Sequence, residues 1–114
     1  MPHDPRKLLH DMLDSCQFVS EFSSGRTLND LRNDRAFRSC VERELQIVGE
    51  ALISLTRIAP ELSSQIGECN RIVRFRHVLV HGYDVIDCEI LWTIVSEKVP
   101  VLIHEVSRLL RHTG

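Results

Sequence analysis

The chain is poor in aromatic residues, prolines and glycines, and it lacks long hydrophobic runs. Aromatic residues make up 5% of its 114 residues, and it has four prolines and five glycines. A core must therefore be built from Leu, Ile and Val, and few residues oppose helix formation. Its uninterrupted apolar runs are far shorter than the roughly 20 residues that a membrane-spanning helix requires. We therefore expect a protein that is rich in helix and does not enter a membrane.

The cysteines give no sign of a zinc site or of a disulfide framework. Cys16, Cys40, Cys69 and Cys88 show no CxxC spacing, and no signal peptide precedes them. Secreted disulfide scaffolds and zinc knuckles carry such signals. We therefore expect a reduced, cytoplasmic protein without a metal or other cofactor.

The length and charge indicate one domain that does not bind nucleic acid by bulk attraction. A chain of 114 residues with 43% apolar content suits a single domain, residues 1–114, with a modest core that a partner subunit would help to stabilise. Its formal net charge is -2, whereas domains that bind nucleic acid by overall charge are usually strongly basic. Any contact with RNA must therefore be local.

Apolar residues recur at helical spacing along most of the chain. We expect helices over about residues 5–22 and 68–80, a shorter stretch that begins near residue 27, a long helix from residue 35 and a last helix from about residue 87. The first stripe comprises Leu9, Met12, Cys16 and Val19, and the stripe of the long helix comprises Val41, Leu45, Val48, Leu52 and Leu55. No strand-like alternation occurs. The predicted fold is an all-α antiparallel bundle of four or five helices.

Several local signals mark the ends of these helices. Asp4 before Pro5 is a typical helix start, and Thr27 with Asp30 resembles a capping box. We expect residues 59–67 to break the helical pattern, because Pro60 resists helix continuation. Pro100 should kink the last helix, since it removes one backbone hydrogen bond.

One segment carries residues suited to cleavage of an RNA phosphodiester. Arg76 is followed by His81 and then by Tyr83, the only tyrosine of the chain. A histidine can transfer protons near neutral pH, and an arginine can bind a phosphate and balance the charge that develops on it. Arg76 and His81 are therefore candidate catalytic residues.

The segment around them is locally basic. Residues 70–83 include three arginines and two histidines and no acidic residue. On an ideal helix Arg71, Arg74, His77 and His81 share one arc, whereas Arg76 and His81 lie roughly 140° apart. Either the helix unwinds near Gly82 or two copies meet and share a cleft, and we favour the dimer.

Simpler interpretations of these residues remain open. Arginines on a helix are often only a solvated face, and a lone histidine or tyrosine is often structural. His77 and His81 have the i, i+4 spacing of a metal pair, but the glutamate of an HExxH site and a third ligand are both missing. We therefore predict no metal.

The motif Arg76-x4-His81-Gly82-Tyr83, followed by Asp84 and Asp87, resembles the RX4HXY motif of the HepT-like toxins of the HEPN superfamily. The similarity includes Val48-Gly49-Glu50-Ala51-Leu52, the Pro60 break, Trp92 and Pro100-Val101-Leu102, and so covers most of the chain. One departure is His77, because members commonly carry asparagine directly after the motif arginine.

The resemblance implies an all-α homodimer that acts as a metal-independent ribonuclease toxin of a type II/VII-like toxin–antitoxin pair. Its antitoxin would be a small nucleotidyltransferase of the MntA type. Arg76 would stabilise the transition state at the scissile phosphate, and His81 would serve as general base or acid around attack by the 2′-hydroxyl. DNA lacks this hydroxyl, so RNA is the expected substrate.

Tyr83 resembles the tyrosine to which the antitoxin transfers AMP, and added phosphates beside His81 would obstruct the cleft and repel RNA. Arg71, Arg74 and His77 are candidate contacts to the RNA backbone, on grounds of charge and shared arc. The alternative function is a non-catalytic helical scaffold that binds the nucleotidyltransferase or its nucleotide.

Overall fold

The computed structural model describes residues 4–80 and 87–112, and for residues 76–80 it describes the backbone alone. Within these residues the regular structure is entirely helical. The elements are α1 (Pro5–Ser23), α2 (Leu28–Asn33), α3 (Arg35–Ile58), α4 (Pro60–Ser63), α5 (Cys69–Val80), α6 (Cys88–Thr93), the π-helical turn η1 (Ile94–Lys98) and α7 (Val99–His112). The predicted all-α class is confirmed.

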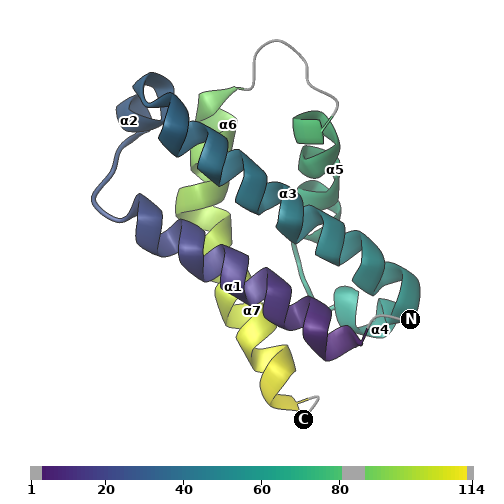
Figure 1. Ribbon diagram of the computed structural model, residues 1–114. Coiled ribbons are helices and arrows are strands. Elements are labelled where there is room, and N and C mark those ends of the chain that lie inside the picture. The colour runs from purple at the N-terminus through teal and green to yellow at the C-terminus, as the bar shows by residue number, and fades with distance from the viewer. Residues whose placement is uncertain (1–3, 81–86, 113–114) are drawn as a thin grey trace.

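Helices α1, α3 and α5 and the continuous run from α6 to α7 form an antiparallel arrangement among the described residues (Figure 1). α1 and α3 run in opposite directions and pack against each other, while α7 packs on α1 and α5 packs on α3. α6, η1 and α7 follow one another without a break and make one long unit that runs opposite to α5. With the short helices α2 and α4, the described part of the chain agrees with the expected bundle of four or five helices.

The core is built from the apolar stripes that the sequence predicts. Leu9, Met12, Cys16 and Val19 of α1 are each at most 1% exposed, and the five stripe residues of α3 are equally buried or nearly so. They join residues of α7 in one hydrophobic cluster. Burial of these faces provides the main driving force for packing the helices.

Side-chain caps fix the starts of the first two helices. The Asp4 carboxylate accepts a hydrogen bond from the backbone N–H of Arg6 at 2.9 Å. The backbone N–H of Asp30 donates to Thr27 Oγ1 at 3.2 Å, and the N–H of Thr27 donates to Asp30 Oδ2 at 2.9 Å, which confirms the predicted capping box. Such caps satisfy N–H groups that a helix start leaves without a partner.

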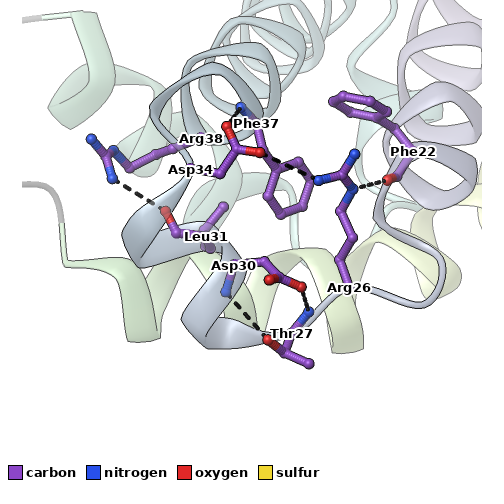
Figure 2. A network of polar contacts seen from close by, with 8 residues as sticks. All are labelled: Phe22, Arg26, Thr27, Asp30, Leu31, Asp34, Phe37 and Arg38. Carbon is purple, nitrogen blue, oxygen red and sulfur yellow. Dashed lines mark hydrogen bonds and ion pairs between the residues drawn. The ribbon is translucent and has the colours of Figure 1, made fainter.

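A polar and aromatic cluster joins the α1–α2 connection to α3 (Figure 2). The guanidinium of Arg26 lies over the rings of both Phe22 and Phe37, 4.8 and 4.6 Å from their centroids, and the two rings meet edge to face 5.5 Å apart. Its Nε donates to the backbone oxygen of Phe22 at 3.0 Å, and its Nη1 lies 3.5 Å from Asp34 Oδ2. Gly25, directly before Arg26, adopts a φ of 78°, which permits the turn between α1 and α2. This Arg26 cluster fixes where α3 begins relative to α1.

Two prolines act somewhat differently from expectation. α3 ends at Ile58 as predicted, but the expectation of a break through residue 67 is wrong in part, because Pro60–Ser63 forms the short helix α4. Proline suits a first helical position, where its missing N–H costs nothing.

The irregularity expected at Pro100 takes the form of a wider turn just before it. The N–H of Val99 bonds to the oxygen of Ile94, five residues back, and Ile94–Lys98 is π-helical. Pro100 has no N–H to offer the oxygen of Ser96, and its ring crowds that carbonyl. The last helix therefore continues as α7 after a local change of pitch.

Across residues 4–80 and 87–112, no helix combines the length and the apolar character needed to cross a membrane.

Candidate functional site

The motif residues lie at and beyond the end of α5. Arg76 and His77 belong to α5, and their backbone is helical. His81 and Tyr83 fall in residues 81–86, outside the described residues, and the side chains of Arg76 and His77 are also outside the description. The relative position of the two candidate catalytic groups therefore stays a prediction.

A groove of about 600 Å³ lies between α5 and the start of the last long unit, and we call it the α5–α6 groove. On α5 it reaches Phe75, the residue before Arg76, and on the other side it includes Asp87, the first described residue after the motif segment. Its lining residues are Arg71, Arg74, Phe75, Asp87, Glu89, Ile90, Thr93, Ile94 and Lys98. The volume is within the roughly 300–1,000 Å³ of small-ligand sites.

Two of the predicted RNA-contacting residues share this groove. Arg71 and Arg74 both line it, as expected from their common arc on the helix. Arg71 Nε lies 3.4 Å from Glu68 Oε2, and Lys98 Nζ lies 3.3 Å from Glu68 Oε1. Arg74 forms no ion pair with the residues that the structure describes, so it is the cation of this wall whose charge is least compensated.

The opposite wall carries carboxylates. Asp87 caps α6, because its Oδ1 accepts from the N–H groups of Glu89 at 2.9 Å and Ile90 at 3.4 Å. Glu89 Oε1 accepts from Arg32 Nη2 of α2 at 2.9 Å. The sequence predicted a locally positive surface over residues 70–83, and in the folded groove two arginines of this segment lie opposite a side that carries Asp87, Glu89 and Lys98.

The floor and rim of the groove are apolar. Ile94 is buried, Phe75 is half-buried, and Ile90 is 52% exposed, the highest value among the exposed large hydrophobic side chains of the described chain. The sequence analysis did not identify these residues or Lys98 as parts of a site. The one local signal was that Ile90 directly follows the acidic Glu89 near the start of a predicted helix.

Among the described residues no group of three or more His, Cys, Asp or Glu side chains is placed to hold a metal ion. The pair His77 and His81 lies outside this statement, because neither side chain is described.

A family model described as "Ribonuclease HepT-like" matches residues 12–109. The chain belongs to the HepT-like ribonuclease family. The match begins within α1 and ends within α7, and so it includes all lining residues of the α5–α6 groove and the whole motif segment.

Curated relatives of this HepT-like chain carry ribonuclease names. It is 34% identical over 103 residues to "Putative RNase MJ1380" of Methanocaldococcus jannaschii, which covers 90% of this chain and 94% of that protein. It is 30% identical over 108 residues to "Putative RNase MJ0127" of the same organism, covering 95% and 88%. It is 28% identical over 102 residues to "Probable ribonuclease HepT" of Thermococcus cleftensis, covering 90% and 92%. No solved structure matches the chain significantly.

Proposed function

We propose that this chain, acting as a single domain, cleaves single-stranded RNA without a metal ion, and that Arg76 and His81 carry out the reaction. Membership of a ribonuclease family supports the activity, and the groove beside the motif segment supports the location. The groove is the single structural observation on which this location depends.

The proposed chemistry uses the ribose itself as nucleophile. The 2′-oxygen attacks the adjacent phosphorus while a base removes its proton, and the bond to the 5′-oxygen breaks as that oxygen gains a proton. The products are a 2′,3′-cyclic phosphate and a 5′-hydroxyl. The imidazole of His81 moves a proton in this step, and the guanidinium of Arg76 stabilises the extra negative charge on the phosphate oxygens.

A homodimer would bring the two groups together. On a regular helix Arg76 and His81 face different directions, so a cleft shared by two copies can pair the arginine of one with the histidine of the other. Two basic walls would then face one groove and attract a strand despite the net charge of -2.

The RNA backbone would bind along the exposed side of α5. Arg74 and Arg71 line the α5–α6 groove, and His77 follows one turn later on the same arc. Arginine suits phosphate because its planar fork can donate two parallel hydrogen bonds.

We further propose that the protein is the toxin of a toxin–antitoxin pair and acts in the cytoplasm. A nucleotidyltransferase of the MntA type would neutralise it by transferring AMP to Tyr83. Modification two residues from His81 would add negative charge and bulk where RNA must enter.

The test of catalysis is cleavage of single-stranded RNA in EDTA by Arg76→Ala and His81→Ala. Matched controls are Arg108→Ala and His104→Ala, two exposed residues of α7 that lie outside the groove. The wild type and both controls should cleave, and both motif variants should lose activity while keeping their fold and oligomeric state. Normal cleavage by both motif variants would remove the catalytic assignment. A wild type that binds the nucleotidyltransferase but never cleaves would favour the scaffold instead.

Regulation has a separate test. After incubation with ATP and the nucleotidyltransferase encoded beside it, mass spectrometry should find AMP on the peptide that contains Tyr83. The same peptide from Tyr83→Phe should keep its mass. An unmodified wild-type peptide would exclude Tyr83 from regulation and leave the nuclease proposal intact.

A further inference from the structure

The α5–α6 groove has features that binding of a phosphate alone does not require. A phosphate site needs donors and positive charge, but this groove also has an apolar floor and a carboxylate wall. Ile90 at its rim is 52% exposed, so a hydrophobic side chain faces solvent on the side of the groove opposite Arg71 and Arg74. A ligand with both a phosphate and a flat apolar part would satisfy these features together.

A nucleotide is such a ligand. Its base can pack against Phe75 and Ile90, and stacking on aromatic or apolar side chains is a general means of holding unpaired bases. A groove of about 600 Å³ admits a nucleotide, and a base reaches such a recess only when it is unstacked from its neighbours. The occupant is therefore a single strand.

The two charged walls determine how the nucleotide enters. Arg74 and Arg71 on α5 attract the phosphate, whereas Glu89 on the opposite wall repels it. Glu89 uses Oε1 for its ion pair with Arg32, and its side chain is 71% exposed, so Oε2 can accept a further hydrogen bond. A carboxylate accepts from an exocyclic amino group, which adenine, cytosine and guanine carry and uracil lacks.

We propose that the α5–α6 groove binds one unpaired, amino-bearing base of the RNA strand, with its phosphate toward Arg74 and its amino group toward Glu89. This rests on the proposed function, because it assumes that RNA is the substrate. Glu89 would then be a specificity residue that selects against uracil at one position of the strand. Asp87 also lines the groove, but its carboxylate is held in place by two backbone N–H groups at the start of α6, whereas that of Glu89 is held by one exposed ion pair.

The experiment measures binding without cleavage. Fluorescently labelled 2′-O-methyl oligonucleotides of adenine, cytosine or uracil cannot be cut, because the attacking oxygen is blocked. Fluorescence anisotropy with the full chain should show adenine and cytosine strands bound at least about fivefold more tightly than uracil strands.

Two pairs of variants locate the binding in the groove. Ile90→Glu should weaken binding of all strands by about tenfold, and Val101→Glu, at a residue 47% exposed on α7, should leave it unchanged. Glu89→Ala should reduce the preference over uracil to less than about twofold, whereas Glu97→Ala on η1 should retain it. Arg32→Gln breaks the ion pair of Glu89 but leaves its carboxylate, so that variant should keep the preference.

The outcomes separate this inference from the proposed function. If wild type cleaves RNA but Ile90→Glu and Glu89→Ala match their controls, the base site is wrong and the nuclease stands. If the strands bind with the expected preference but wild type never cleaves unmodified RNA, the catalytic proposal fails and the groove assignment survives. Equal binding of all three strands by wild type overturns the role of Glu89, and no binding overturns the site.

Discussion

The Arg26 cluster makes a quantitative prediction about stability. The guanidinium lies 4.8 and 4.6 Å from two ring centroids, and each such contact is worth about 0.5–1 kcal/mol at a partly exposed position. The hydrogen bond from Nε to the Phe22 oxygen adds about 1 kcal/mol, and the 3.5 Å ion pair with Asp34 adds little, since both side chains are partly hydrated. Arg26→Ala should therefore lower the free energy of unfolding by about 2–3 kcal/mol.

Urea denaturation followed by circular dichroism, at one fixed protein concentration, measures this loss directly. At roughly 4 °C per kcal/mol for a chain of this size, Tm should fall by about 8–12 °C. Arg26→Lys keeps the charge but loses the planar group and the Nε bond, so it should lose about half as much.

The matched control is Arg43→Ala, because Arg43 is an exposed arginine of α3 with one 3.4 Å contact to Gln46. It should change the unfolding free energy by less than about 0.5 kcal/mol. A second check is Phe37→Leu, which should remove part of the Arg26→Ala effect in the double variant. If Arg26→Ala and Arg43→Ala are equally stable, the reasoning about the cluster is wrong.

Three further predictions concern the core and its titrating groups. Leu52→Ala should lower the free energy of unfolding in denaturant by about 2–5 kcal/mol, because Leu52 is 0% exposed. Ile58→Ala, at a residue 39% exposed, should lower it by less than about 1 kcal/mol, and equal losses in the two variants would contradict the packing of the core. Burial raises the pKa of the Cys16 thiol to about 12, so a thiol reagent at pH 8 should label Cys16 only after unfolding, and native labelling of that peptide would refute its placement. Desolvation raises the pKa of the Glu42 carboxyl, and the nearby charge of Arg38 opposes this shift. The folded state therefore binds the proton of Glu42 more tightly than the unfolded state does, and the stability of the fold falls as pH rises through the folded-state pKa. Glu42→Gln should therefore be more stable than wild type at neutral pH by less than about 1 kcal/mol, and this gain should vanish below the ordinary glutamate pKa of 4.5. A gain in stability that persists in acid would show that the charge of Glu42 is not its cause.

The helices were predictable where the signals are local. The stripe Leu9, Met12, Cys16 and Val19 follows the helical period, and the capping box of Thr27 and Asp30 requires only residues three apart. Pro60 was ambiguous, since a proline both ends one helix and starts another. The π-helical turn before Pro100 was not foreseen, because its form depends on how the surrounding helix accommodates a crowded carbonyl.

The candidate site was only partly predictable for a different reason. Arg71 and Arg74 were found because they share a segment with the motif, and both line the groove. Glu89, Ile90 and Lys98 come from a later segment, and only the folding of α6 and η1 opposite α5 makes them the other wall. Sequence spacing within one helix cannot predict such a pairing between two helices.

The assignment of the strand-cleaving chemistry has one direct test. A DNA oligonucleotide with a single ribonucleotide offers one 2′-hydroxyl, and wild type in EDTA should cut only on the 3′ side of that nucleotide. The fragments should carry a 2′,3′-cyclic phosphate and a 5′-hydroxyl, and His81→Ala should produce neither. Cutting at the deoxyribonucleotides, or a linear 5′-phosphate at the cut site, would contradict the proposed role of Arg76 and His81.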